Sequence, residues 1–268
     1  MGSIQINIPA NEDQQNILIS QLSDLGAEGF EQYDDQLVAY FNENNFDSYE
    51  VNKSLDGYKY SSQTIPDQNW NEVWESNFQP VVINDFCGIR AEFHDPIPNI
   101  QYEIIITPKM SFGTGHHATT HMMVEQMSKM DFRNKTVFDF GTGTGILAIL
   151  AEKLGAEKVI AIDVDDWSIK NSEENCRKNN CTKVYTSLSS NLPEQQFDIV
   201  LANINKNVIL QYLPQLKKIL KNDSQILFSG LLVEDEEDIL SACVSYDIKL
   251  EQRLSRNNWI SLLCVTRS

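Results

Sequence analysis

The sequence predicts an α/β protein, in which an open, mostly parallel sheet with helices on both faces follows a small α+β domain. From residue 136 onward, short apolar runs alternate with helical patterns, which is typical of parallel sheets. Residues 1–62 instead follow the order strand, helix, strand, strand, helix, strand, the ferredoxin-like arrangement. We therefore expect a ferredoxin-like domain over 1–62, a helical linker over 63–79 and an α/β domain over 80–268.

The elements of the first domain are short. Their apolar periodicity predicts strands over 3–8, 29–34, 37–42 and 58–65 and helices over 11–25 and 47–55. In the linker, Asp67 is a suitable N-cap for a helix that carries apolar and polar residues at helical spacing, Trp70, Val73, Trp74 and Asn77.

The second domain is expected to open with a hairpin layer and then to alternate strands and helices. The layer comprises strands over 80–85, 87–93 and 102–107. The main strands are expected over 136–140, 158–164, 183–187, 197–204 and 224–232, with helices up to 154 and over 166–179, 208–220 and 234–244. The last two strands, over 246–256 and 259–267, form an antiparallel hairpin at one edge.

The net charge of −17 disfavours nucleic acid as a direct partner, because such a surface repels phosphates. A basic protein suits this charge better, although solubility alone is a sufficient explanation. No apolar run is long enough to span a bilayer, and the N-terminal residues do not follow the pattern of a signal peptide. We therefore expect a cytoplasmic protein that does not associate with a membrane. The five cysteines form no CxxC pair and fit reduced thiols.

The stretch "TVFDFGTGTGILAIL" (136–150) predicts a ligand-binding turn between a strand and a helix. Gly141 and Gly143 allow a sharp bend and a close approach, and the following helix offers free N–H groups. In a doubly wound sheet, ligands bind at this turn. Asp163 ends the next strand, where its carboxylate can accept hydrogen bonds from ribose hydroxyls.

The glycine spacing bears on the identity of the ligand. A dinucleotide fingerprint is G-x-G-x-x-G/A, whereas Gly141, Gly143 and Gly145 follow G-x-G-x-G after the acid Asp139. This pattern favours S-adenosylmethionine over a dinucleotide, because the carboxylate and ammonium of that cofactor need both donors and an acceptor. We therefore expect Asp139, Gly141 and Gly143 to bind the cofactor. A glycine-rich turn without any ligand is the alternative.

The fourth main strand ends in "ANIN" (202–205), at the same sheet edge as the glycine turn. The side-chain carbonyl of Asn203 can accept a hydrogen bond from an incoming amine. Asn203 is therefore the candidate catalytic residue, which would orient the amine while the proton leaves to solvent. The alternative is an asparagine that caps the helix near Val208.

A second glycine loop lies in "SFGTGHHATTHMMVEQM" (111–127), just before a helix. We expect this loop to fold over the cofactor, with Phe112 as a packing surface and Thr114 and Thr120 as hydrogen-bonding groups. A metal site is the alternative, because His117 and His121 are four residues apart. The HExxH pattern is absent, however, and no nearby cysteine or acid completes a ligand set, so we expect no metal.

These motifs resemble the PrmA-type methyltransferases. "FGTGHHATT" (112–120) is similar to the FGTGTHPTT element of that family, and residues 137–165 resemble its cofactor motif almost throughout. "VLANI" (200–204), "FSGLL" (228–232) and "NNWISLLC" (257–264) resemble three later elements. The likeness runs from Trp70 to the C-terminus, and the first element is not shared by class I methyltransferases at large.

The resemblance implies a Rossmann-like class I methyltransferase domain behind a substrate-recognition domain and a linker. It implies methyl transfer from S-adenosylmethionine to the α-amine and lysine side chains of large-subunit ribosomal protein eleven. Cofactor contacts then fall on Thr120, Gly141, Asp163 and Asn203. His116 and Ala118 depart from the family pattern, as does "NKN" (205–207), which leaves other substrates open. The alternatives are a class I methyltransferase for another protein or a small amine, and a cofactor-binding assembly factor without turnover.

Overall fold

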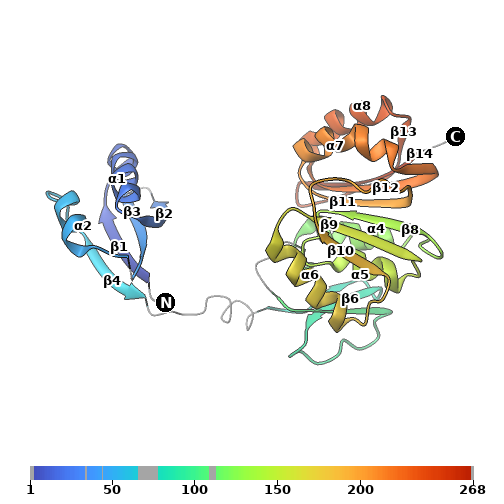
Figure 1. Ribbon diagram of the computed structural model, residues 1–268, viewed down its shortest axis with the longest axis horizontal. Helices are drawn as coiled ribbons and strands as arrows, with labels where there is room; N and C mark the ends of the chain where they lie inside the picture. Colours follow the sequence, from blue (N-terminus) through green and yellow to red (C-terminus); the bar gives the residue numbers. More distant parts are fainter. Residues whose placement is uncertain (1–2, 34, 44, 66–77, 109–112, 267–268) are drawn as a thin grey trace. The chain divides into compact units, whose positions relative to one another are not determined.

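The computed structural model describes residues 3–33, 35–43, 45–65, 78–108 and 113–266 (Figure 1). The chain divides into two compact units, Met1–Trp74 and Glu75–Ser268, and separate apolar clusters lie inside each of them. Most of the expected linker helix, including Asp67, Trp70, Val73, Trp74 and Asn77, lies outside the described residues. Within the described residues, no helix is long and apolar enough to cross a membrane.

The first unit is an antiparallel four-stranded sheet with strand order β2-β3-β1-β4. Its elements are β1 (Ser3–Pro9), α1 (Glu12–Asp24), β2 (Ala27–Tyr33), β3 (Gln36–Asn42), α2 (Ser48–Ser54) and β4 (Ser61–Ile65). This is the element order that the sequence predicts. β4 reaches Ile65, so the sheet of this unit extends past the expected boundary at residue 62.

Local sequence explains where the first helix begins. The Asn11 side chain accepts a hydrogen bond from the Gln14 amide at 3.0 Å, and the Gln14 side chain accepts one from the Asn11 amide at 3.0 Å. This reciprocal pair is a capping box, which satisfies two N–H groups that the helix leaves free. Ile6 and Ile8, on alternate positions of β1, are completely buried in the core beneath α1.

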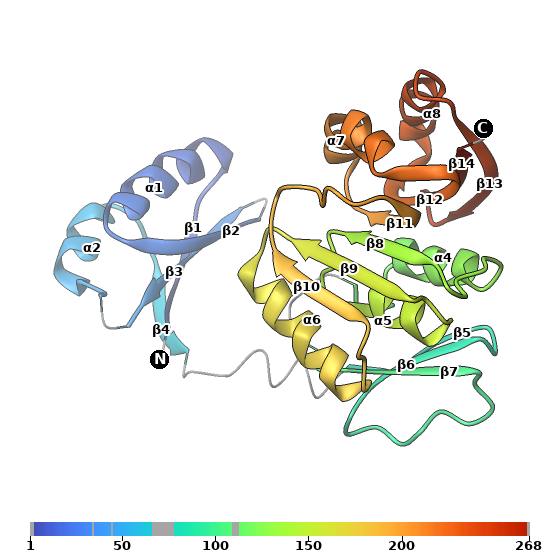
Figure 2. The same ribbon diagram turned by 45° about the vertical axis from the view of Figure 1, so that its right-hand side comes forward.

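The second unit is built on a seven-stranded sheet with the order β10-β9-β8-β11-β12-β14-β13 (Figure 2). The first five of these strands are parallel, and β14 runs antiparallel to both β12 and β13. The strands are β8 (Thr136–Phe140), β9 (Lys158–Asp163), β10 (Val184–Leu188), β11 (Phe197–Asn203), β12 (Leu220–Leu232), β13 (Ile248–Arg256) and β14 (Trp259–Thr266). The expected parallel sheet with an antiparallel edge hairpin is confirmed.

Helices cover both faces of this sheet (Figure 2). One face is covered by α4 (Ala118–Met127), α5 (Ile146–Lys153) and α6 (Asp166–Lys178), and the other by α7 (Lys206–Lys218) and α8 (Glu236–Val244), with a 3-10 turn over Val233–Asp235. Strand order reverses between β8 and β11, because β9 and β10 follow on one side of β8 and β11 and β12 on the other. Ligands bind at such a switch point in open α/β sheets.

A small sheet of β5 (Val81–Ile83), β6 (Cys87–Ala91) and β7 (Tyr102–Ile106) packs beside α5 and α6. β5 and β6 form an antiparallel hairpin, but β6 and β7 are parallel, so the expected hairpin layer is only partly right. The segment between Ala91 and Tyr102 is long enough to bring the chain back to the start of β6, which a tight turn cannot do.

Candidate active site

A cavity of about 630 Å³ opens at the carboxyl ends of β8, β9 and β11, where the strand order reverses. Gly141 and Gly143 line it from the turn after β8, Asp163 from the end of β9 and Asn203 from the end of β11. The structure therefore brings together four of the residues that the sequence singles out. The volume lies in the usual range of small-molecule sites.

The glycine turn is held by backbone hydrogen bonds. The amides of Gly141 and Thr142 both donate to the Ile162 carbonyl, at 2.9 and 3.0 Å. Gly141 has a φ of +77°, and a Cβ at this position would lie 2.5 Å from Cγ2 of Ile204. Only glycine fits this turn, and the small residue leaves the cavity open above it.

Asp163 is oriented by two backbone amides. Its Oδ2 accepts from Gly143 at 2.9 Å and its Oδ1 from Asp165 at 3.0 Å. A carboxylate has about four lone-pair sites, so two remain free for a ligand. Because Asp163 lines the cavity, these sites suit a pair of hydroxyl groups.

Asn203 and Thr120 meet across two segments that lie far apart in the sequence. Asn203 Nδ2 donates to Thr120 Oγ1 at 3.3 Å, and both residues line a smaller hollow beside the main cavity. Oδ1 of Asn203 is buried and has no hydrogen-bond partner among the described residues. Asn205, not Asn203, caps α7, because its side chain accepts from the Val208 amide at 3.1 Å. The capping alternative thus applies to the neighbouring asparagine.

Asp139 lies beneath the glycine turn and does not line the cavity. Its side chain is 1% exposed, and its Oδ2 accepts from the Thr142 hydroxyl at 2.7 Å. Burial raises the pKa of Asp139 to about 7, and the Thr142 hydrogen bond only partly offsets this rise. Asp139 therefore supports the turn from below.

The start of α4 reaches the cavity through His117 and Thr119, which both line it. Phe112 lies outside the described residues. The Thr114 hydroxyl lies 3.3 Å from His116 Nδ1, and Thr114 does not line the cavity. His117 is the N-cap of α4, and its Nδ1 accepts from the Thr119 amide at 3.3 Å.

The two histidines of the metal alternative belong to different contacts. His117 caps its helix, whereas His121 Nε2 lies 2.7 Å from Nη1 of Arg256. Burial, followed by the neighbouring Arg256 guanidinium, lowers the pKa of His121. Over the residues that the structure describes, no group of three or more histidine, cysteine, aspartate or glutamate side chains could hold a metal ion.

Comparison with known proteins agrees with this geometry. The family model described as ribosomal protein L11 methyltransferase (PrmA) matches residues 3–267. The chain belongs to the ribosomal protein L11 methyltransferase family. The relative of that name in Porphyromonas gingivalis is 40% identical over 260 residues, which cover 92% of this chain and 89% of the relative. The relative in Phocaeicola vulgatus is 35% identical over 265 residues, with 95% and 94% covered.

A solved structure of this family has the same fold. The crystal structure of the ribosomal protein L11 methylase from Lactobacillus delbrueckii subsp. bulgaricus matches with a TM-score of 0.66 and 30% sequence identity. The match covers 71% of this chain and 100% of that chain. The expected Rossmann-like methyltransferase fold is thus confirmed for the second unit's sheet.

The residues of the cavity fit S-adenosylmethionine, the methyl donor expected in this family. Asp163 presents free carboxylate lone pairs to ribose hydroxyls. The turn at Gly141 has no Cβ in the way, and Gly145 starts α5 without a side-chain cap, which leaves helix N–H groups for a carboxylate. The buried Oδ1 of Asn203 has no donor among the described residues and can accept a hydrogen bond from a bound molecule.

Sequence reasoning missed part of the L11 methyltransferase cavity. Trp259, at the start of β14, and Tyr212, on α7, also line the wall. The Trp259 ring packs edge-on against His117 with centroids 4.8 Å apart, and the Tyr212 hydroxyl donates to the Ser190 carbonyl at 3.1 Å. No spacing rule connects these residues to the glycine turn; only the likeness of "NNWISLLC" to the family pointed at Trp259.

Proposed function

We propose that this chain transfers methyl groups from S-adenosylmethionine to the N-terminal α-amine and to lysine ε-amines of ribosomal protein L11. The observation that carries the proposal is the buried Oδ1 of Asn203, a cavity residue at the switch point of the sheet, which has no hydrogen-bond partner in the described part of the chain. The relatives named ribosomal protein L11 methyltransferase support the substrate.

The chemistry requires positioning more than acid or base groups. When bound, S-adenosylmethionine supplies a methyl group that its sulfonium has already activated. Asp163 holds ribose hydroxyls, and the turn at Gly141 and Gly143 admits the amino-acid end of the cofactor. Asn203 accepts a hydrogen bond from the neutral amine and aligns its lone pair with the methyl carbon.

The proton of the acceptor amine leaves to solvent. An α-amine has a reference pKa of about 8 and is partly neutral at cellular pH, whereas a lysine with a reference value of about 10.4 must first be desolvated. The largely apolar residues around the cavity, among them Ile204, Val208 and Trp259, supply such desolvation. The enzyme therefore needs no strong base.

The proposed partner is a basic protein, which the net charge of −17 attracts. The same charge disfavours direct contact with nucleic acid, and we propose none. We propose the cytoplasm as the location, because the proposed substrate is a ribosomal protein. The ferredoxin-like unit is the proposed recognition domain, because the cavity residues all belong to the second unit.

Replacement of Asn203 by alanine tests the proposed catalytic role. We expect Asn203→Ala to slow methylation of ribosomal protein L11 by about 100-fold, because the amine loses its alignment. The cofactor affinity, measured by calorimetry, should change much less than the rate. Asn205→Ser is the matched control, since it changes another asparagine of the cavity wall but keeps a capping oxygen for α7. A wild-type rate with unchanged cofactor affinity in Asn203→Ala would contradict the role.

A further inference from the structure

Three asparagines lie four residues apart along α6 and its C-cap, and the proposed reaction uses none of them. Asn171, Asn175 and Asn179 lie on one face of the helix turn by turn. Asn171 and Asn175 are completely buried, which is unusual for this residue type. Their amides therefore need partners inside the protein.

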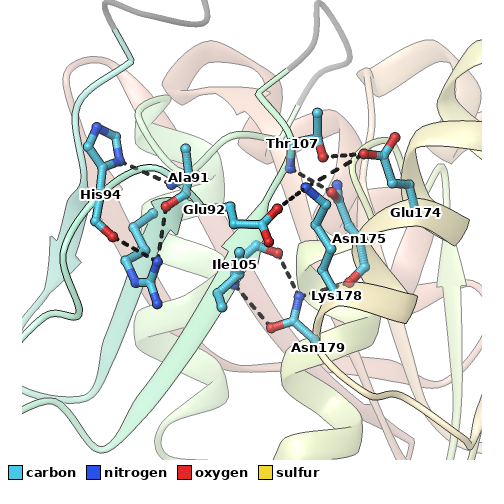
Figure 3. A network of polar contacts seen from close by, with 10 residues as sticks. Ala91, Glu92, His94, Ile105, Thr107, Glu174, Asn175, Lys178 and Asn179 are labelled. Atoms are coloured by element: carbon cyan, nitrogen blue, oxygen red, sulfur yellow. Dashed lines mark hydrogen bonds and ion pairs between the residues drawn. The ribbon is translucent and has the colours of Figure 1, made fainter.

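Two of these side chains pair with the edge strand of the small sheet. Figure 3 shows Asn175 and Asn179 projecting from α6 toward Thr107 and Ile105. The Asn179 side chain accepts from the Ile105 amide at 3.0 Å and donates to the Ile105 carbonyl at 2.6 Å. Asn175 Oδ1 accepts from the Thr107 amide at 2.8 Å. The helix thus offers β7 the hydrogen bonds that a neighbouring strand would supply.

Asn175 alone extends this contact to the glycine turn. Its Nδ2 donates to the Thr144 carbonyl at 2.8 Å, within the turn that lines the cavity. Thr144 is completely buried, and its hydroxyl donates to the Gly113 carbonyl at 2.6 Å. Thr107 is thus joined to the glycine turn through Asn175, and Gly113 is joined to it through the Thr144 hydroxyl. Gly113 then leads into α4, which carries Thr120.

The spacing between α6 and the turn leaves little room for adjustment. Gly145 has a φ of +82°, and a Cβ at this position would lie 3.0 Å from Cβ and 3.3 Å from Cα of Ser172. The helix therefore contacts the turn directly, with no side chain of Gly145 between them. At this close approach, the length of the Asn175 side chain determines where the Thr144 carbonyl lies.

We propose that Asn175 is a positioning residue for the cofactor. Through Thr144 it fixes the glycine turn relative to both β7 and Gly113, so that the turn has its binding conformation before the cofactor arrives. If the turn is already ordered, no binding free energy is lost in ordering it when the cofactor binds. This inference rests on the proposed function, since it concerns the same cavity.

Asn175→Asp tests the inference, because it keeps the shape and the acceptor but replaces the Nδ2 donor by oxygen. Asn179→Asp is the matched control: it makes the same change one turn later, at the C-cap of α6, where the side chain bonds β7 but not the glycine turn. Calorimetry measures the Kd of S-adenosylmethionine and of S-adenosylhomocysteine, and thermal unfolding measures the stability of each variant. We expect the Kd to rise about tenfold for Asn175→Asp and to change less than about twofold for Asn179→Asp.

Thr144→Val is the second variant if Asn175→Asp does not fold. It removes the hydroxyl that holds Gly113 and keeps the carbonyl that Asn175 binds, so it should also raise the Kd. An unchanged Kd in Asn175→Asp, or in Thr144→Val if only that variant folds, overturns the inference. The inference is also overturned if the Kd rises equally in Asn175→Asp and Asn179→Asp and the rise is proportional to the stability that each variant loses. If the wild type itself binds neither ligand, the proposed function fails first and the inference fails with it.

Discussion

At the scale of single residues, the two acids of the cofactor motif have opposite environments. Asp163 lines the cavity and accepts two backbone hydrogen bonds at the end of β9. Asp139 is buried below the turn, where its Oδ2 accepts from the Thr142 hydroxyl. Burial is the main reason why the pKa of Asp139 is about 7, and the charge of Asp163 adds to it.

The raised pKa of Asp139 predicts a pH-dependent stability. Its carboxyl is protonated in the folded state up to a pH of about 7, but only up to its usual value of 3.8 when unfolded. As the pH rises between these two values, the free energy of unfolding of the wild type should therefore fall relative to that of Asp139→Asn. The fall is up to about 1.4 kcal/mol per pH unit and ends above a pH of about 7. Denaturant unfolding of both proteins from pH 4 to 8 measures this difference; parallel profiles would contradict the assignment.

The sequence predicts the residues that meet at strand ends better than those that meet through packing. Gly141, Asp163 and Asn203 could be predicted together because parallel strands end at one edge of a sheet. The burial of Asp139 could not be predicted, since its position in the motif resembles that of a ligand-binding acid. Asn175 carried a visible signal, the asparagine repeat at every fourth residue, but its partner Thr144 follows only from the packing of α6 on the turn.

At the scale of elements, the site depends on the close approach of β11 and β12. Gly230 lies at a bulge in β12 with a φ of +81°, directly beside the residue that follows Asn203. A Cβ at this position would lie 2.4 Å from the Ile204 carbonyl oxygen and 2.8 Å from its carbon. Backbone, unlike a side-chain tip, cannot move aside cheaply. Gly230 therefore keeps the end of β11 in place.

Gly230→Ala should lower both stability and activity. We expect a loss of about 3 kcal/mol or more, because strain in the left-handed region adds to overpacking against backbone. Gly57→Ala is the control: its φ is +89°, but nothing lies within 4 Å of the added Cβ, so only the conformational cost of about 1–2 kcal/mol applies. Denaturant unfolding and cofactor calorimetry measure both variants. Equal losses in the two variants would contradict the packing argument.

The order of elements could be predicted because hydrophobic periodicity and turn residues mark each strand and helix locally. The parallel pairing of β6 with β7 could not be predicted in this way. Both strands are ordinary apolar runs, and their parallel direction depends on how the intervening segment returns. The amides of Ile105 and Thr107 in addition donate to the side chains of Asn179 and Asn175. Such long-range partners leave no mark on the spacing within the strand.

At the scale of the whole molecule, the chemistry and the proposed recognition belong to different units. Every residue that lines the cavity lies within Glu75–Ser268, and the small antiparallel sheet belongs to Met1–Trp74. The family model matches residues 3–267, which include both units. The cavity therefore belongs to the second unit, and substrate recognition is the proposed role of the first.

The most direct test of the central claim is mass spectrometry of ribosomal protein L11 from the same organism after incubation with this protein and S-adenosylmethionine. We expect mass increments of whole methyl groups at the N-terminus and at lysines, and a strongly reduced yield with Asn203→Ala. An unmodified L11, with cofactor binding shown by calorimetry, would contradict the proposed substrate and point to another amine-bearing acceptor or to an assembly factor without turnover.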